Sequence, residues 1–197
     1  MPQVPLGEGD AAVLNLIREE ELAGFSFDGL KRRLGLHSET LSRTLGRLEE
    51  RDIVERAERG YKVTSKAKNL LALRPLSAGG ASVPLLRTLL PHDIPIQQVI
   101  SDLMGRWFGM LRWLGYSEED GGVTLKWITD NGRVQVDANF SDAGLTVEAK
   151  LREGDDLSAA VRASYQLMRY MSTLYSRLGT TRPGVHLLAF SPHLMAN

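Results

Sequence analysis

The chain has 197 residues, of which 24 are basic, 24 acidic and none cysteine. Its net charge of zero argues against a polycation that coats nucleic acid, and the lack of cysteine excludes disulfides, thiol redox chemistry and cysteine-ligated metal sites. No signal-peptide pattern opens the sequence, and no apolar run approaches the roughly 18 residues of a membrane span. We therefore expect a soluble cytoplasmic protein with no membrane partner.

Residues 1–73 show a helical pattern that gives way to a hairpin. Asp10 is expected to cap a first helix over residues 11–22. A second helix follows and ends at Gly35, because glycine takes a positive φ without steric cost. Ser38 is the expected N-cap of a third helix, in which Leu41, Leu45 and Leu48 share one face.

Strand-like residues begin after Asp52. Residues 53–54 and 61–64 are expected to pair across a tight turn at 58–60, and Ser65 is expected to cap a helix that reaches residue 73.

The order helix, tight turn, helix and β-hairpin resembles the winged helix-turn-helix of the MarR- and ArsR-like transcription regulators. The resemblance covers roughly residues 10–73. It implies that residues 38–51 form a recognition helix for the DNA major groove and that residues 56–62 form the wing.

Charge is uneven in a way that suits this resemblance. Residues 31–74 carry twelve bases against six acids, whereas residues 1–30 carry one base against six acids. A local basic excess is the electrostatic pattern expected of phosphate contact.

The candidate DNA-binding residues lie on the second helix, the third helix and the wing. We expect Arg43 to read guanine and Arg59 to reach DNA from the wing tip. The full set is Lys31, Arg32, Arg33, Ser38, Thr40, Ser42, Arg43, Arg47, Arg56, Arg59 and Lys62. The alternative is a winged helix that docks on proteins without base readout, in which case these residues form a solvated face.

Residues 75–94 have the proline, glycine and serine content of a linker, which a short helix over 85–90 interrupts. The second domain, residues 95–197, is expected to begin with a long helix over 96–114. Strands at 122–129, 133–140 and 145–151 follow as an antiparallel meander, joined first by the turn at Asp130, Asn131 and Gly132. A helix over 157–178 and a short strand over 185–190 complete the chain.

The predicted fold class is therefore α+β. It comprises a winged helix-turn-helix domain (1–74), a linker and an α-β-β-β-α domain with a three-stranded meander.

The helix over 157–178 carries an apolar seam with alternating spacings of four and three, as in a heptad repeat. We expect a homodimer interface there, and packing on the meander is the alternative. The seam comprises Leu157, Val161, Ser164, Met168, Met171, Tyr175 and Leu178.

Aromatic and methionine residues of the second domain form either an ordinary core or a pocket for a small apolar effector. The pocket would involve Met104, Trp107, Phe108 and Trp127.

The sequence contains no recognisable catalytic or metal-binding motif. The four histidines lack metal-ligand spacing, and the sequence contains no phosphate-binding loop or dinucleotide fingerprint. Asp137 fits an exposed strand face. We expect no enzyme activity and no cofactor, and a homodimeric transcription regulator that reads double-stranded DNA.

Overall fold

The computed structural model describes residues 7–71, 82–90, 94–119, 121–151 and 157–179. The elements of its first part are α1 (Glu8–Glu19), β1 (Gly24–Phe25), α2 (Phe27–Leu34), α3 (Ser38–Glu50), β2 (Val54–Ala57), β3 (Gly60–Val63) and α4 (Ser65–Leu71). Those of its second part are β4 (Ser82–Thr88), α5 (Ile96–Leu103), β5 (Leu111–Glu119), β6 (Gly122–Thr129), β7 (Val134–Ser141), β8 (Gly144–Leu151) and α6 (Leu157–Gly179).

All eight of these strands belong to one antiparallel sheet, in the order β2-β3-β1-β5-β6-β7-β8-β4. The predicted fold class is therefore wrong, because a single sheet joins the hairpin to the meander and three further strands extend it. The join is β1, which pairs with β3 on one side and with β5 on the other.

The contact between β1 and β5 depends on two glycines. A Cβ atom on Gly115 would lie 2.3 Å from the carbonyl oxygen of Gly24, and one on Gly24 would lie 2.4 Å from the ring of Tyr116. Side chains at these positions would push the strands apart, so glycine permits the close pairing.

Two predicted helices of the second part are corrected. The helix expected over 96–114 ends at Leu103, and β5 begins at Leu111. Gly105 and Gly109, which lie between the two elements, have positive φ values of 78° and 57°, and this conformation ends the helix. Leu111, Trp113 and Leu114 are all buried, but in a strand. The helix expected over 85–90 is also wrong, since those residues fall in and just after strand β4, within the stretch predicted as a linker.

Other local predictions are confirmed. Gly35 ends α2 in the left-handed conformation with φ of 65°. The hairpins β2–β3 and β6–β7 form where their turns were expected, and β7 and β8 pair as neighbouring strands of the predicted meander. The helix over 157–178 is present as α6, and the strand expected over 185–190 lies outside the described residues.

The first helix begins earlier than predicted. It starts at Glu8 after the N-cap Gly7. Asp10 lies inside the first turn, where its carboxylate accepts a hydrogen bond from the Gly7 amide at 3.1 Å.

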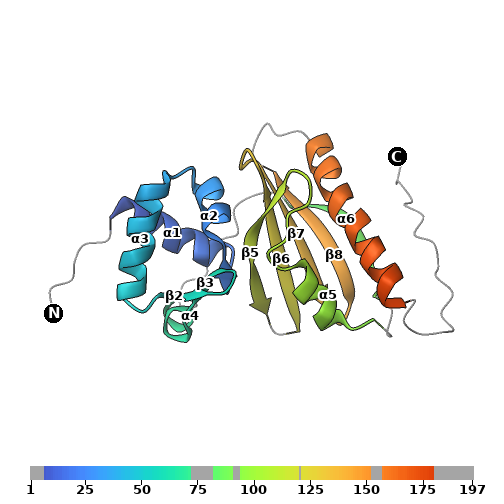
Figure 1. Cartoon of the computed structure of the whole chain (residues 1–197), viewed down its shortest axis with the longest axis horizontal. Coiled ribbons are helices and arrows are strands. Elements are labelled where there is room, and N and C mark those ends of the chain that lie inside the picture. The colour runs from blue at the N-terminus through green and yellow to red at the C-terminus, as the bar shows by residue number, and fades with distance from the viewer. Residues whose placement is uncertain (1–6, 72–81, 91–93, 120, 152–156, 180–197) are drawn as a thin grey trace.

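The two faces of the sheet have different neighbours. Leu125, Trp127, Val136 and Ala149 share one hydrophobic core with the buried side of α6. The other face of the sheet is turned toward the N-terminal helices. These helices pack around a second hydrophobic core, whose residues lie between Val13 and Ala67 in the sequence. Figure 1 shows α1, α2 and α3 on one side of the sheet and α6 on the other. No helix in the described part of the chain is long and apolar enough to cross a membrane.

Candidate functional site

Helix α3 has a buried side and an exposed side. Leu41, Leu45 and Leu48 are fully buried, as their spacing predicted, whereas Thr40, Ser42 and Arg43 are exposed. Figure 1 places α3 at the outer end of the molecule, away from the strands β5–β8. A large partner can therefore approach the exposed side of α3 without meeting the sheet.

The start of α3 differs from the prediction. His37 is the N-cap and makes no side-chain cap, and Ser38 is the first helical residue. The Ser38 hydroxyl accepts a hydrogen bond from Lys31 Nζ at 3.2 Å, so these two residues lie together beside the N-terminal end of α3.

The exposed arginines near α3 are paired with acids. Arg43 Nη2 lies 2.5 Å from Glu39 Oε1, and both side chains are about three-quarters exposed (72% and 75%). Arg56 on β2 contacts Glu49 at 3.1 Å. Exposed ion pairs contribute only about 0–1 kcal/mol, so a phosphate or a base can displace these acids at small cost.

Arg47 has a structural position instead of the predicted exposed one. Its guanidinium binds Asp10 Oδ1 at 2.6 Å through Nη2 and at 3.1 Å through Nε. The Asp10 carboxylate is fully buried, and the hydrogen bond from Arg47 holds the Asp10 pKa below its ordinary value despite burial. Arg47 therefore ties α3 to α1.

Arg32 and Arg33 also contact other parts of the chain. Arg32 lies 3.6 Å from Asp130 in the β6–β7 turn, and Arg33 lies 3.5 Å from Glu20 at the end of α1. Lys31 on the same helix differs, because its hydrogen bond to Ser38 places it beside α3.

A buried polar network joins α1 to the sheet. Glu20 Oε2 contacts Lys150 Nζ at 2.6 Å, Gln135 Nε2 at 2.8 Å and Lys126 Nζ at 3.4 Å, and Lys126 and Lys150 also contact Asp137. Burial alone would raise the Glu20 pKa, but Lys126 and Lys150 outweigh it and lower the pKa to about 2. Burial would lower the Lys150 pKa, and Asp137 and Glu20 raise it instead.

This network was not predicted from the sequence. Asp137 was expected on an exposed face, although its side chain is only 9% exposed. The available signal was polar alternation. Lys126, Gln135, Asp137 and Lys150 all occupy the strand positions between the core residues.

The hairpin carries the remaining predicted DNA contacts. Lys62 is exposed on β3. Arg59 at the hairpin turn donates from Nη1 to the carbonyl oxygens of Ser101 and Met104, both at 3.0 Å. The predicted wing tip therefore contacts the end of α5.

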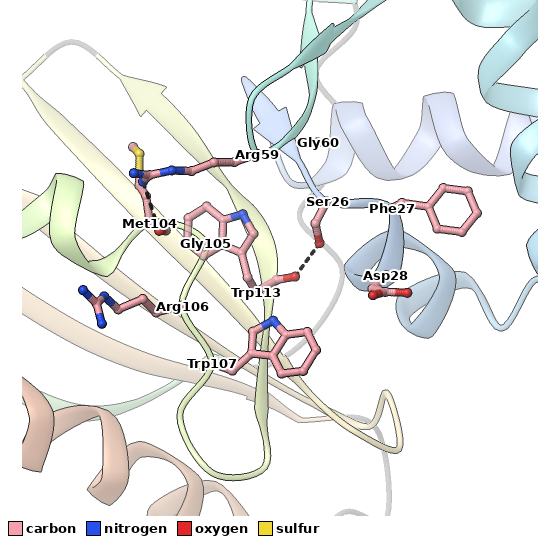
Figure 2. A pocket seen from close by; sticks show the side chains of 10 residues that line it. All are labelled: Ser26, Phe27, Asp28, Arg59, Gly60, Met104, Gly105, Arg106, Trp107 and Trp113. Carbon is pink, nitrogen blue, oxygen red and sulfur yellow. Dashed lines mark hydrogen bonds between the residues drawn. The ribbon is translucent and has the colours of Figure 1, made fainter.

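A pocket of about 440 Å³ lies between the N-terminal helices and the loop after α5. Figure 2 shows Trp107 and Trp113 in its centre, with Arg59 and Met104 on one side and Asp28 on the other. Trp107 is 57% exposed, and the Arg112 guanidinium lies 4.7 Å from its ring centroid.

The four predicted effector-pocket residues do not form one site. Met104 and Trp107 line the pocket. Phe108 and Trp127 are buried in the core, where their rings meet edge to face at 5.6 Å.

The predicted dimer seam is divided in the same way. Ser164, Met171 and Tyr175 are buried against the chain's own sheet, and Met168 is partly buried there. Leu157 and Val161 are about half exposed (46% and 48%). The Leu178 side chain lies outside the described residues.

Over the described ranges, no group of three or more histidine, aspartate or glutamate side chains is arranged to hold a metal ion. The chain matches no family model, no curated protein and no solved structure.

Proposed function

We propose that the chain is a transcription regulator that binds double-stranded DNA through α3 and the β2–β3 hairpin. The observation that carries the proposal is that α3 lies at the outer end of the molecule with Thr40, Ser42 and Arg43 exposed on it. The major groove is wide enough to admit one α-helix with such side chains. The resemblance to winged helix-turn-helix regulators supports the same assignment.

In this proposal the role of each side chain follows from what it contacts in the free chain. Arg43 releases Glu39 and donates both Nη groups to a guanine, while Thr40 and Ser42 contact neighbouring base edges. Lys31, Ser38, Arg56 and Lys62 contact phosphates, which fixes the register of α3 without reading sequence. Arg47, Arg32 and Arg33 support the fold and do not touch DNA.

A second function, docking on a protein partner, is favoured by one observation. Among the described bases between residues 31 and 74, at least seven form ion pairs with carboxylates: Arg32, Arg33, Arg43, Arg47, Arg56, Lys66 and Lys68. This pairing neutralises much of the basic excess on which DNA binding depends. A surface of mixed charge suits a protein partner.

The test compares Arg43→Ala with Arg169→Ala on duplexes selected by the wild-type chain from a random pool. Arg169 is exposed on α6, on the other side of the sheet from α3, so its removal controls for the lost charge. Fluorescence anisotropy should show that Arg43→Ala weakens binding by about 1–3 kcal/mol and relaxes preference at one base pair.

Arg169→Ala should leave both quantities unchanged. Equal affinity and equal base preference for Arg43→Ala and the wild type would contradict the placement of α3 in the groove. Capture of a protein partner that Arg43→Ala abolishes, without duplex binding, would establish the docking function instead.

We further propose a cytoplasmic homodimer without catalytic activity, because paired DNA half-sites require two copies. Leu157 and Val161 are the exposed part of the predicted seam, and Tyr165, which the predicted seam did not include, is exposed one turn further along α6. These three side chains are able to meet a second copy. Light scattering should give twice the chain mass of 21.8 kDa, and Val161→Glu should return the monomer. A monomeric wild-type chain at micromolar concentration would contradict the dimer.

The pocket of Figure 2 is the place where a small apolar effector would act in this proposal. It differs from the predicted set, since Trp113 and Phe27 replace Phe108 and Trp127 among its aromatic lining.

A further inference from the structure

Arg59 connects the hairpin turn to the C-terminal end of α5. One nitrogen, Nη1, donates to the carbonyl oxygens of both Ser101 and Met104 at 3.0 Å. Figure 2 shows the Arg59 side chain extended from the hairpin toward Met104. Ser101 and Met104 are 42 and 45 residues from Arg59 in the sequence, so this contact joins separate parts of the fold.

Helix α5 needs donors at this end. The last carbonyls of a helix have no intrahelical partner, and the helix dipole makes them electronegative. The last turn of α5 contains no basic residue of its own. Arg106 caps the Asp102 carbonyl, and Arg59 caps Ser101 and Met104.

The loop after α5 is shaped around the Arg59 side chain. Gly105 has φ of 78°, and a Cβ atom there would lie 3.3 Å from Arg59 Cδ. Any other residue at position 105 would meet backbone strain and would crowd the arginine stem. A substitution at Gly105 can therefore weaken the contact of Arg59 with α5 while the positive charge of Arg59 is kept.

The partners of Arg59 are neutral, and no carboxylate pairs with it within the described ranges. Arg59 is also exposed. A charged phosphate oxygen is a stronger acceptor for a guanidinium than a carbonyl oxygen. A nearby DNA backbone would therefore compete for this side chain.

We propose that Arg59 latches the hairpin to α5 in the free protein and transfers to a DNA phosphate when the chain binds. This inference rests on the proposed function and adds regulation to it. Because the same side chain cannot hold α5 and a phosphate at once, the latch opposes DNA binding. Whatever tightens or loosens the end of α5, including a molecule in the adjoining pocket, changes DNA affinity through Arg59.

The latch itself is tested by hydrogen exchange in the free, full-length chain. Arg59→Ala should speed amide exchange in residues 101–106 and 57–61 by about three- to tenfold, because the α5 end loses its capping donor. Lys62→Ala removes the same charge from the same hairpin and should leave the exchange of α5 unchanged. Unchanged exchange at the end of α5 in Arg59→Ala would overturn the latch.

Transfer to DNA is tested with Gly105→Ala, which keeps Arg59 but crowds its docked position. Gly105→Ala should bind the selected duplex about three- to tenfold more tightly, whereas Arg59→Ala should bind it more weakly. Gly121→Ala, at another positive φ with open space around it, controls for backbone strain. Equal or weaker binding by Gly105→Ala than by Gly121→Ala would overturn the transfer.

Hydrogen exchange of the wild-type chain on DNA needs no substitution. Faster exchange at residues 101–106 in the complex supports transfer, and unchanged exchange there overturns it. A wild-type chain that binds no duplex at low salt overturns the transfer and the proposed function together. The exchange of Arg59→Ala in the free chain still decides the latch.

Discussion

Glu20 should contribute strongly to stability although it lies at the end of a helix and has no part in the proposed DNA contacts. The ordinary glutamate pKa is 4.5, and in the folded chain Lys126 and Lys150 bring it to about 2. Each pKa unit corresponds to about 1.4 kcal/mol, so the folded environment favours the Glu20 carboxylate by roughly 3 kcal/mol at neutral pH. Glu20→Gln should remove a free energy of this order.

The pH dependence has a definite direction. Because the folded pKa is the lower one, the unfolded chain takes up a proton first as pH falls. The contribution of Glu20 is therefore fully present above about pH 4.5 and is lost progressively between pH 4.5 and about 2.

The assay is urea denaturation of the wild type and Glu20→Gln at pH 7 and at pH 3, with Glu19→Gln as a control. Glu19 is the exposed neighbour of Glu20. Glu20→Gln should lose roughly 3 kcal/mol at pH 7 and less at pH 3, while Glu19→Gln should change little at either pH. A loss below about 1 kcal/mol at pH 7, or an equal loss in Glu19→Gln, would show that the buried network does not stabilise the fold through Glu20.

Two further predictions concern stability. Arg47→Ala should lower the free energy of unfolding because it leaves the buried Asp10 carboxylate without its partner. In a denaturant titration, Asp10→Asn combined with Arg47→Ala should lose less than the sum of the single variants, and full additivity would contradict the pair. Gly115→Ala should cost about 1–3 kcal/mol because its Cβ would lie 2.3 Å from the Gly24 carbonyl oxygen. Thermal denaturation beside Gly121→Ala measures this, and equal melting temperatures would contradict the close pairing of β1 and β5.

The helices of the N-terminal part were predictable because their signals are local. The helix end at Gly35 and the buried face of Leu41, Leu45 and Leu48 each depend on residues within one or two helical turns. The structure confirms both predictions. The turn at Asp130, Asn131 and Gly132 was equally local.

The sheet as a whole was not predictable, because its joining strands carry no local pattern. Strand β1 has only two residues, Gly24 and Phe25, which in sequence resemble a helix end. Strand β5 is buried on both faces from Trp113 to Gly115, so the apolar and polar alternation that marks a half-buried strand is missing there. Its apolar residues therefore matched helical spacing instead.

The contacts of the individual candidate residues could not be predicted from the sequence. Arg43 and Arg47 are four residues apart, and sequence reasoning treated both as DNA contacts. Asp10 distinguishes them, because it binds Arg47 from 37 residues away, a distance over which a periodicity argument has no information. Glu20 meets Lys150 across 130 residues for the same reason.

A salt series on the wild-type chain is the decisive experiment for DNA binding by the exposed side of α3. The logarithm of the affinity for the selected duplex should fall linearly with the logarithm of salt concentration, and the preference over a scrambled duplex should persist. Affinity that is independent of salt, or an equal affinity for both duplexes at every salt concentration, would contradict phosphate docking with base readout.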